Sequence, residues 1–419
     1  MDIMVIGAGG REHAIIKALR KSPRAGRIYC LPGNGGIAAD AECVEIGAGD
    51  IPGICAFART HGVGFAVVAP DDPLVLGAVD ALHALGIPCF GPDKAAAAIE
   101  GSKIFAKELM KKYRIPTAAY ESFDSVEEAW RYIDTQSLPL VVKADGLALG
   151  KGVVIARTRE EAREAVEEMI AGGRFGQSGR RVVIEEFLTG PEVSVLSFTD
   201  GETLIPMVSS MDHKRALDGD RGPNTGGMGT VAPNPFYTPE IAERCMREIF
   251  LPTVAAMKAE GRPFRGCLYF GLMLTPQGPR VLEYNCRFGD PETQVVLPLL
   301  ESDLLEIMLA AEEGRLKDTE VRFASGAACC VVMASRGYPQ AYEKGFPITV
   351  DGPLTAELYA AGTTLSRDGL VTGGGRVLGV SARGENLAEA VQRAYENVEK
   401  VHFANAFYRK DIGRRALEA

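Results

Sequence analysis

The chain has 419 residues, which predicts about three domains at a typical size of roughly 150 residues each. Hydrophobic residues make up 46% of the sequence and charged residues 24%, an ordinary globular composition that excludes disordered, collagenous and disulfide-stapled chains. The formal net charge of −9 disfavours a general nucleic-acid binder, because phosphate backbones need a basic face. A local cluster of Lys and Arg would still bind a small anion.

The sequence predicts a cytoplasmic protein with no membrane span. Its longest apolar stretches, such as residues 327–334, fall well short of the roughly 18 residues of a transmembrane helix. The N-terminus Met1-Asp2-Ile3 lacks the basic region of a secretory signal. None of the nine cysteines forms a Cys-x-x-Cys pair, so we expect reduced thiols and no zinc site.

The first hundred residues alternate strand and helix patterns. Such alternation predicts βαβ units around a parallel sheet. A longer helical pattern over residues 93–113 then leads out of this region. The expected strands are residues 2–6, 27–31, 64–69 and 87–90, and the expected helices are residues 12–21 and 72–85.

A second region begins near Ile115-Pro116 and has the pattern of a small α+β unit. Its expected elements are strands at 138–143, 153–156 and 181–187 and a helix at 159–171.

The third region, residues 192–323, mixes strands with a long polar loop at 212–229. The last part of the chain opens with the buried strand 327–334 and ends with a helix at 386–401 and a basic tail.

The first glycine-rich loop, Gly7-Ala8-Gly9-Gly10-Arg11-Glu12, lies between a strand and a helix, where backbone N–H groups attract phosphate. A dinucleotide fingerprint needs glycine or alanine in place of Glu12, and an acidic residue at the end of the second strand, which is absent. These departures disfavour an NAD-dependent dehydrogenase. A phosphate or phosphosugar contact is the preferred interpretation, and a tight turn that needs glycine for packing is the alternative.

A second glycine-rich loop runs from Lys143 to Gly152. It is not a Walker A loop, because the spacing and the Ser or Thr after the lysine are missing and a strand follows it. A glycine loop between two antiparallel strands instead predicts a lid over nucleotide phosphates. Lys143 stands in an otherwise apolar strand and needs an anionic partner, either a bound phosphate or an internal carboxylate. Lys103 is a weaker candidate by itself.

Oxygen ligands and cations follow in the last third of the chain. Glu283 and Asn285 are two apart on one strand, so they share a face and suit Mg²⁺ bound jointly with phosphates. An exposed polar face is the alternative for this pair, and Arg287 beside it favours the metal. The polar loop 212–229 places Lys and Arg next to an acid, which suits an anionic substrate, although a solvated loop is the alternative.

These motifs in this order resemble the ATP-grasp superfamily and, more closely, the glycinamide ribonucleotide synthetase family. The resemblance covers nearly the whole chain. It rests most firmly on the long runs Gly222-Pro-Asn-Thr-Gly-Gly-Met-Gly229 and Arg287-Phe-Gly-Asp-Pro-Glu-Thr293. The other matching segments are residues 7–13, 32–34, 101–103, 142–146, 212–215, 285–292 and 408–414.

The resemblance implies an α/β and α+β multidomain fold. It places an N-terminal parallel-sheet domain at residues 1–101 and an ATP-grasp domain at residues 102–326. A lid subdomain is expected at about residues 116–188, and a small C-terminal domain at residues 327–419. The implied enzyme is a monomeric carbon–nitrogen ligase that joins glycine to 5-phosphoribosylamine with ATP and Mg²⁺ or Mn²⁺, in purine biosynthesis. The implied route passes through glycyl phosphate.

The family also implies roles for individual residues. Lys214, Asn224 and Arg287 would be catalytic, and Glu283 and Asn285 would bind the metal. ATP would be bound by Lys103, Lys143, Gly146, Gly150, Lys151, Gly152, Glu185, Glu186, Phe187, Leu188 and Glu192. The substrates would be bound by Gly9, Gly10, Arg11, Glu12, Asn34, Asp71, Asp212, Thr225, Gly226, Asp290, Pro291 and Glu292.

Three departures from the family pattern concern the site. Asp71 stands where the family often has Glu, and Cys286 where it commonly has Ala. Residues 269–273 contain no carboxylate, whereas many ATP-grasp enzymes carry a metal-binding carboxylate about a dozen residues before the metal-binding Glu. Two other readings stay open from the residues. The first is another ATP-grasp ligase, which the polar loop argues against, and the second is a non-catalytic nucleotide-binding module.

Overall fold

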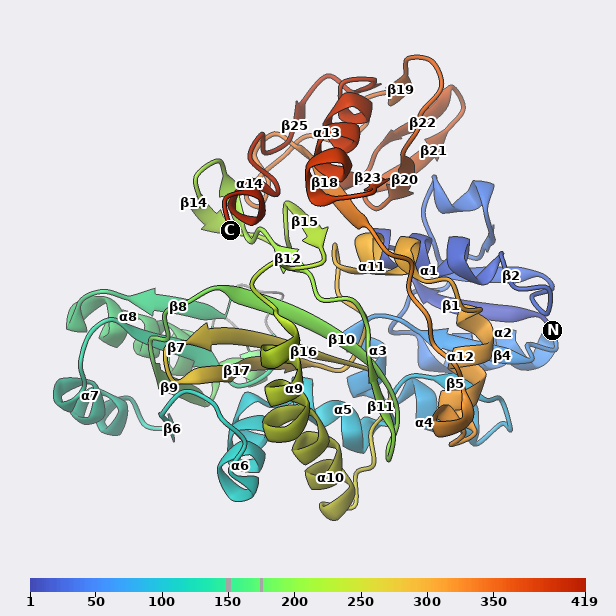
Figure 1. Ribbon diagram of the computed structural model, residues 1–419. Helices are drawn as coiled ribbons and strands as arrows, with labels where there is room; N and C mark the ends of the chain where they lie inside the picture. Colours follow the sequence, from blue (N-terminus) through green and yellow to red (C-terminus); the bar gives the residue numbers. More distant parts are fainter. Residues whose placement is uncertain (148–151, 174–175) are drawn as a thin grey trace.

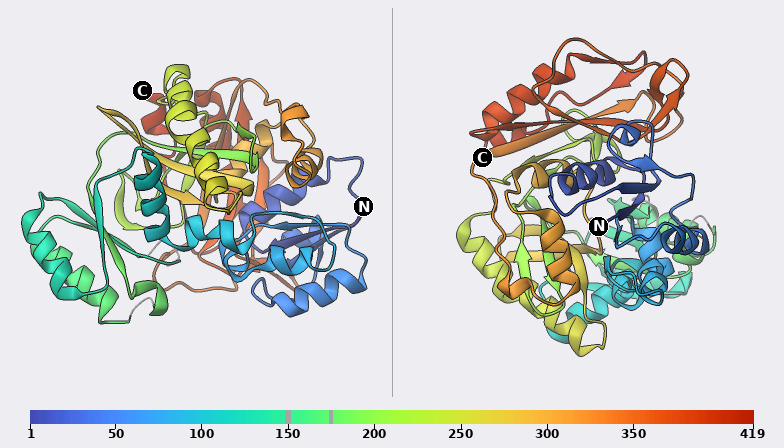
Figure 2. Two further views of the ribbon diagram at one scale, coloured as in Figure 1. Left: turned by 90° about the horizontal axis from the view of Figure 1, so that it is seen from below. Right: turned by 90° about the vertical axis from the view of Figure 1, so that its right-hand side faces the viewer.

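The computed structural model describes residues 1–147, 152–173 and 176–419. Within these ranges the chain forms an N-terminal sheet of five strands, a lid sheet of four, a central sheet of four and a C-terminal sheet of six. Figure 1 and the left view of Figure 2 show the lid and the N-terminal sheet at opposite ends of the central sheet. In Figure 1 the C-terminal sheet lies above them. This is the mixed α/β and α+β arrangement that the sequence predicts.

The N-terminal sheet has the strand order β3-β2-β1-β4-β5, and its pairings are parallel, as the alternating pattern predicts. Every residue of β1 is buried, which fits a parallel strand that is covered on both faces. The strands are β1 (Ile3–Gly7), β2 (Ile28–Pro32), β3 (Glu42–Cys43), β4 (Phe65–Val68) and β5 (Cys89–Phe90). The helices are α1 (Gly10–Leu19), α2 (Ile51–Thr60), α3 (Asp71–Leu76), α4 (Ala78–His83), α5 (Lys94–Gly101) and α6 (Lys103–Tyr113).

Two of the expected helices are interrupted, so the prediction of one continuous helix is wrong at both places. Helix 72–85 is the pair α3 and α4, separated by Gly77 with a left-handed φ of 95°. Helix 93–113 is the pair α5 and α6, with Ser102 extended between them. The Ser102 hydroxyl caps α6 by accepting a hydrogen bond from the Phe105 N–H at 3.1 Å. Periodicity misses both breaks because the apolar pattern continues across them.

The lid is an antiparallel sheet with the strand order β6-β9-β7-β8, and α7 and α8 pack on it through a separate hydrophobic core. The antiparallel pairing of β7 with β8 confirms the expected setting of the second glycine-rich loop. Residues 148–151 of that loop, including Gly150 and Lys151, lie outside the described residues. The elements are β6 (Tyr120–Phe123), α7 (Val126–Thr135), β7 (Leu140–Ala144), β8 (Val153–Ala156), α8 (Arg159–Ile170) and β9 (Val182–Glu186).

The central antiparallel sheet, β11-β10-β16-β17, separates two hydrophobic cores. Val193 and Val195 of β10 enter one core with α10, whereas Leu196 and Phe198 enter the other with α12. The strands are β10 (Glu192–Asp200), β11 (Leu204–Pro206), β16 (Arg265–Thr275) and β17 (Gly278–Asn285). The helices are α9 (Pro239–Cys245), α10 (Leu251–Ala259), α11 (Thr293–Leu299) and α12 (Leu304–Glu312), with a π-helix (Met246–Phe250) joining α9 to α10.

The C-terminal sheet has the order β12-β15-β18-β23-β20, and β25 also pairs with β18. All nine residues of β18 are buried, as the apolar run predicts. The main elements are β18 (Ala327–Ser335), β20 (Glu357–Ala360), β23 (Arg376–Gly384), α13 (Leu387–Val398), β25 (Ala406–Phe407) and α14 (Arg414–Leu417). Two separate two-stranded sheets also form after β18: β19 (Thr349–Val350) pairs with β24 (Val401–His402), and β21 (Thr363–Ser366) pairs with β22 (Gly369–Thr372).

The expectation that residues 212–229 form one irregular loop is wrong. This segment, which we call the polar loop, contains β13 (Arg215–Leu217) and β14 (Arg221–Asn224), which pair as a hairpin. Its two ends belong to β12 (Met211–Asp212) and β15 (Gly229–Ala232), and β15 pairs with β18. The C-terminal sheet therefore contains strands from both sides of residue 326. The sequence signal was hidden because the strands are short and polar.

The nine cysteines are free thiols, as expected. In the described part of the chain, no helix is long and apolar enough to cross a membrane.

Candidate active site

The start of α6 is tied to the start of the second glycine-rich loop. The Ser102 hydroxyl donates to Asp145 Oδ1 at 2.9 Å, and the Lys103 ammonium donates to the Gly146 carbonyl at 3.0 Å. Arg181 pairs with the other Asp145 oxygen at 2.7 Å. Burial lowers the pKa of Lys103, and Glu283 opposes that effect. These hydrogen bonds hold residues 101–103 against the start of the second glycine-rich loop. Lys103 is the first residue of α6.

Two buried lysines share a single carboxylate beneath the lid. Lys143 of β7 lies 3.1 Å from Glu185 Oε2, and Lys107 of α6 lies 3.3 Å from the same oxygen. Lys143 also donates to the Leu282 carbonyl of β17 at 3.2 Å. Burial lowers the pKa of Lys107 to about 8, although Glu185 raises it. Of the two anionic partners that the sequence allowed for Lys143, the internal carboxylate is therefore present, and it is Glu185. Two lysines share this one carboxylate, so one positive charge is left without its own negative partner.

Lys107 is a residue that sequence reasoning missed. It follows Lys103 by four positions on α6, so the two side chains lie on one face of the helix. This spacing of four residues is the sequence signal that could have identified Lys107 as a partner of Lys103. Glu185, which the family resemblance assigns to ATP binding, has its side chain engaged as the common partner of both buried lysines.

The end of β17 is organised by Glu100, a second residue that sequence reasoning missed. Asn285 Nδ2 and Arg287 Nη2 both donate to Glu100 Oε1, at 2.9 Å and 3.0 Å. The Cys286 N–H donates to the other Glu100 oxygen at 2.7 Å. Arg287 also lies 3.6 Å from Asp71. Burial and the Arg287 charge act in opposite directions on the pKa of Glu100, and burial raises it overall.

The charge of Glu283 on β17 is favoured by several cations. Burial by itself would raise the pKa of this carboxyl, but Lys214, Lys143, Lys103 and Arg287 together hold it below its ordinary value. The Lys214 ammonium lies 3.9 Å from Glu283 Oε1 and 3.2 Å from Glu192 Oε2. Lys214 thereby connects the polar loop with β10 and β17.

Asp212 and Glu292 are two carboxyl groups whose charges interact, with Lys214 and Arg376 as the cations that act on Asp212. Asp212 Oδ1 is buried and has no hydrogen-bond partner among the described residues. Glu292 is only 4% exposed and accepts a hydrogen bond from the Tyr269 hydroxyl at 3.0 Å. Burial and the Glu292 charge raise the pKa of Asp212 well above its ordinary value.

The N-terminal glycine-rich loop is tied to the Arg287–Thr293 segment. Arg11 Nη1 donates to the Phe288 carbonyl at 3.2 Å, and the Arg11 N–H donates to Asp290 at 3.2 Å. Glu12 accepts a hydrogen bond from the Gly9 N–H at 2.5 Å and pairs with Arg11. Asn34 uses both ends of its amide on the chain itself, donating to the Ala8 carbonyl and accepting from the Gly36 N–H.

Other expected residues are less clearly placed. Asn224 is exposed on β14, and in the described structure no contact joins its side chain to the cations around Glu283. Thr225 donates its hydroxyl to the Lys214 carbonyl at 2.9 Å, which supports the lysine. The Gly226 carbonyl accepts a hydrogen bond from Arg376 at 2.7 Å. Phe187 is exposed after the end of β9.

The polar loop is anchored to the end of the chain. Arg409 is 1% exposed and donates to the Arg215 carbonyl and to Asp220 at 3.0 Å and 2.9 Å. His213 contacts the Gly229 carbonyl through Nδ1, and its Nε2 accepts a hydrogen bond from the Gly413 N–H. These two contacts require a neutral imidazole, because Nε2 must carry a free lone pair. Burial and the Arg409 charge lower the pKa of His213 to about 4.

Three parts of the chain match the domains of one protein family. Residues 1–100 match the phosphoribosylglycinamide synthetase N domain, residues 101–293 its ATP-grasp (A) domain, and residues 328–415 its C domain. The chain belongs to the phosphoribosylglycinamide synthetase family.

Similarity to relatives extends over the full length. The chain is 50% identical to a phosphoribosylamine–glycine ligase of Allochromatium vinosum, covering 100% of this chain and 99% of that protein. It is 48% identical to one of Vibrio vulnificus with the same coverage. The crystal structure of phosphoribosylamine–glycine ligase from Thermotoga maritima has a TM-score of 0.87 and 38% identity, covering 98% of this chain and 100% of that one. A biotin carboxylase of Campylobacter jejuni, 13% identical with a TM-score of 0.77 over 97% of this chain and 92% of that one, shares the fold alone.

The predicted family, three-domain fold and ATP-dependent carbon–nitrogen ligase class are therefore confirmed. So is the overall reaction, the ATP-dependent formation of glycinamide ribonucleotide in purine biosynthesis. The domain boundaries, the roles of single residues, the monomeric state and the cytoplasmic location stay predictions.

We expect acid to weaken the fold through His213. Its pKa is about 4 in the folded chain and about 6.5 when unfolded, so falling pH protonates the unfolded chain first. The free energy of unfolding should therefore fall by up to about 3 kcal/mol between pH 6.5 and pH 4 and level off below. Urea unfolding at several pH values measures this.

The matched control for this titration is His213→Gln. The amide keeps a donor and an acceptor but does not titrate, so its stability should depend less steeply on pH in this window. Parallel pH curves for the two proteins would contradict the prediction.

Proposed function

We propose that the chain joins glycine to 5-phosphoribosylamine through a glycyl phosphate intermediate. In the first step a glycine carboxylate oxygen attacks the γ-phosphorus of ATP, and ADP leaves. In the second step the amine of phosphoribosylamine attacks the acyl carbon, phosphate leaves and the amine loses a proton. The observation that carries this proposal is the placement of three lysines: Lys103 is held at the Gly146 carbonyl and Lys143 at the Leu282 carbonyl of β17, and Lys214 lies 3.9 Å from Glu283 of the same strand. Phosphoryl transfer needs positioned positive charge and no protein nucleophile.

Lys103 and Lys143 are the residues that we assign to the ATP phosphates. They approach from α6 and from β7, and each is held by a backbone carbonyl that leaves further ammonium hydrogens for phosphate. Glu185–Leu188 would border the adenine, and Glu192 would accept hydrogen bonds from the ribose hydroxyls. Gly146 and Gly152 begin and end the loop that would cover the phosphates.

The residues at the end of β17 fit a divalent cation that is shared with phosphates. Glu283 and Asn285 supply one carboxylate and one amide oxygen, and Mg²⁺ in nucleotide sites commonly takes one or two protein oxygens. The described residues contain no group of three or more His, Cys, Asp and Glu side chains for an all-protein cage. The Lys214 ammonium lies near Glu283, so this carboxylate already stabilises one positive charge. Bound Mg²⁺ or Mn²⁺ would neutralise phosphate charge there.

We assign Asp212 and Glu292 to the ammonium group of glycine. Two buried carboxyl groups, one with an unpaired oxygen, suit a small cation that brings its own hydrogen-bond donors. Lys214 and Arg287 would then face the glycine carboxylate. A Cβ atom added to Gly227 would lie 2.8 Å from Asp212 Oδ1, so the wall beside Asp212 is tight. Little free space beside Asp212 favours glycine over an amino acid that has a side chain.

Phosphoribosylamine is assigned to the junction of the N-terminal loop with the Arg287–Thr293 segment. The Arg11 guanidinium, held at the Phe288 carbonyl, and the Arg376 guanidinium, beside Asp290, would offer positive charge to a sugar phosphate there. Asp71 borders the same junction through Arg287, and Pro291 stands where a Cβ atom added to Gly227 would meet it. Asn34 and Glu12 hold the loop in shape through their internal hydrogen bonds. Thr225 and Gly226 hold the facing polar loop.

The experiment that tests the function is ADP release from ATP and Mg²⁺, with glycine and freshly made phosphoribosylamine added separately and together. Release that requires both substrates, with formation of the amide, is the expected result. Release with neither or only one of them would indicate another ATP-grasp ligase. Absence of turnover despite ATP binding would indicate a binding module.

Replacing Lys143 tests the phosphate assignment. Lys143→Ala should lower turnover by roughly tenfold or more, because a preorganised charge beside the transferred phosphoryl group is lost. Steady-state ADP release measures the effect. The control is Lys112→Ala, which removes an exposed lysine of the same region. Equal turnover of the two variants, both folded, would refute the assignment.

Replacing Glu283 tests the metal ligand. Glu283→Gln should raise the Mg²⁺ concentration that gives half-maximal turnover, because an amide oxygen attracts a divalent cation less than a carboxylate does. Titration of activity with Mg²⁺ and with Mn²⁺ measures the shift. Glu243→Gln, on an exposed helix, should titrate like the unchanged protein. Superimposable metal titrations of both variants would exclude Glu283 as a ligand.

Replacing Asp212 tests the glycine assignment. Asp212→Asn should raise the KM for glycine about tenfold or more, since a neutral amide does not balance the ammonium charge. The KM for ATP should change less, because Asp212 is not among the residues assigned to ATP. Asp368→Asn, at an exposed turn, is the control. A raised KM for ATP with an unaltered KM for glycine would be incompatible with this assignment.

A further inference from the structure

The strand that carries Glu283 and Asn285 lies at the edge of the central sheet. In the order β11-β10-β16-β17, strand β17 comes last and pairs with β16. The backbone groups on its other side face no further strand of the described sheet, so they need partners from elsewhere in the chain. The contacts that hold this outer side also hold the two residues that we assign to the metal.

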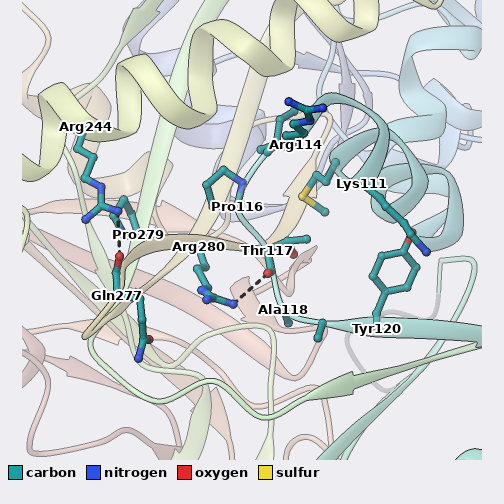
Figure 3. Close-up of a pocket in the computed structure, with 13 residues that line it drawn as sticks. Lys111, Arg114, Pro116, Thr117, Ala118, Tyr120, Arg244, Gln277, Pro279 and Arg280 are labelled. Atoms are coloured by element: carbon teal, nitrogen blue, oxygen red, sulfur yellow. Dashed lines mark hydrogen bonds between the residues drawn. The ribbon is translucent and has the colours of Figure 1, made fainter.

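The start of β17 is held by the segment that follows α6. The Val281 N–H donates to the Pro116 carbonyl at 2.8 Å, and the Thr117 hydroxyl donates to the Val281 carbonyl at 2.7 Å. The Arg280 guanidinium donates to the Thr117 carbonyl at 3.3 Å (Figure 3). These contacts hold the start of the strand and do not reach Asn285.

The end of β17 is held by Glu100, which lies in the last turn of α5 and is 7% exposed. One of its carboxylate oxygens accepts a hydrogen bond from the Cys286 N–H at 2.7 Å. The other accepts from Asn285 Nδ2 at 2.9 Å and from Arg287 Nη2 at 3.0 Å. One buried carboxylate therefore bonds to three consecutive residues and fixes both the backbone and the side chains at the end of the strand.

The contact with Glu100 determines which end of the Asn285 amide is left for a metal. An amide donates through its nitrogen and accepts through its oxygen, and Mg²⁺ binds the oxygen. The Glu100 oxygen beside Asn285 also accepts from the Arg287 guanidinium, so it meets the amide nitrogen. A rotated amide would bring its oxygen against the carboxylate. Within the described residues, no hydrogen bond occupies the Asn285 amide oxygen.

Glu100 also belongs to the turn that carries an assigned ATP ligand. Helix α5 ends at Gly101, Ser102 is extended, and Lys103 begins α6. Glu100 contacts the end of β17, whereas Lys103 donates to the Gly146 carbonyl of the second glycine-rich loop. One short segment thus places a phosphate ligand and the partner of a metal ligand. This arrangement suits a metal that is shared with phosphates.

We propose that Glu100 is a positioning residue for the metal, which holds the Asn285 amide with its oxygen free to bind Mg²⁺ or Mn²⁺. Replacing a residue that orients a metal ligand commonly weakens metal binding by roughly 10- to 100-fold. The proposal rests on the assignment of Asn285 as a metal ligand in the proposed function. Glu100 itself acts through Asn285 and needs no contact with the metal or the substrates.

The test measures how strongly Mg²⁺ tightens the binding of a non-hydrolysable ATP analogue to the full chain. Calorimetry gives the Kd of the analogue in EDTA and in Mg²⁺, and the ratio of the two values is the metal effect. In Glu100→Gln the metal effect should fall about fivefold or more, because an amide has one accepting oxygen and loses either the Cys286 N–H or the Asn285 amide. The Kd in EDTA should stay nearly unchanged.

The matched control for loss of a buried carboxylate is Asp200→Asn. Asp200 is 5% exposed and accepts hydrogen bonds from the Thr203 and Leu316 N–H groups at 2.7 Å and 3.1 Å. It ends β10, at the opposite end of that strand from Glu192. Its replacement should lower the unfolding temperature and leave the metal effect unchanged. An equal loss of the metal effect in this control and in Glu100→Gln would overturn the proposal.

A double variant shows whether Glu100 acts through Asn285. Asn285→Ala should itself reduce the metal effect, and adding Glu100→Gln should then change it little further, because the amide to be oriented is gone. Independent reductions that multiply in the double variant would overturn the proposal. If Glu100→Gln does not fold, Glu100→Asp takes its place, since the shorter side chain keeps the charge and reaches less far toward its three partners.

The outcomes separate this inference from the assignment on which it rests. A reduced metal effect in Asn285→Ala with an unchanged one in Glu100→Gln overturns the role of Glu100 alone. An unchanged metal effect in Asn285→Ala overturns the ligand assignment and the positioning role together. Because calorimetric binding needs no turnover, neither result depends on the ligase reaction, which ADP release tests separately.

Discussion

The sharing of one buried carboxylate by two buried lysines is the interaction on which the candidate site depends. Glu185 comes from β9, Lys107 from α6 and Lys143 from β7, and Lys143 also reaches β17. The lid is thereby joined to the central domain by charge as well as by packing. Burying unpaired charge is costly, so these three side chains constrain one another. A single carboxylate for two cations still leaves positive charge for a phosphate.

Several cations also favour the charged form of Glu283, and most of them have a second carboxylate partner, such as Glu192 for Lys214 and Glu100 for Arg287. Keeping these like charges near one another is unfavourable for the empty protein. It is favourable for binding, since the charges are already in position when phosphates arrive and need no reorganisation. A ligand that supplies the missing negative charge also stabilises the folded chain by mass action. Stability and function are thus opposed at this site.

Precise placement of Lys214 requires support from outside the ATP-grasp domain, because Lys214 lies in the polar loop. Arg409, buried near the end of the chain, holds that loop at the Arg215 carbonyl and at Asp220. His213, which directly precedes Lys214, accepts a hydrogen bond from the Gly413 N–H. Since β12 and β15 also belong to the C-terminal sheet, this sheet forms part of the site's framework. Residues on loops position chemistry well when a rigid scaffold holds them in this way.

The sequence by itself determined the family, the alternation of strands and helices in the first hundred residues, and the chemical types at the site. Motifs such as residues 222–229 and 287–293 are contiguous, so their meaning survives without coordinates. Only the tertiary structure decided that Glu185 is the partner of Lys107 and Lys143, that Glu100 orders the end of β17, and that Arg409 holds the polar loop. These contacts join residues that are far apart in the chain, and charge pairing over such separations is set by packing and not by local pattern. The breaks at Gly77 and Ser102 were missed for a related reason, because local periodicity does not record where a helix must turn to meet its neighbours.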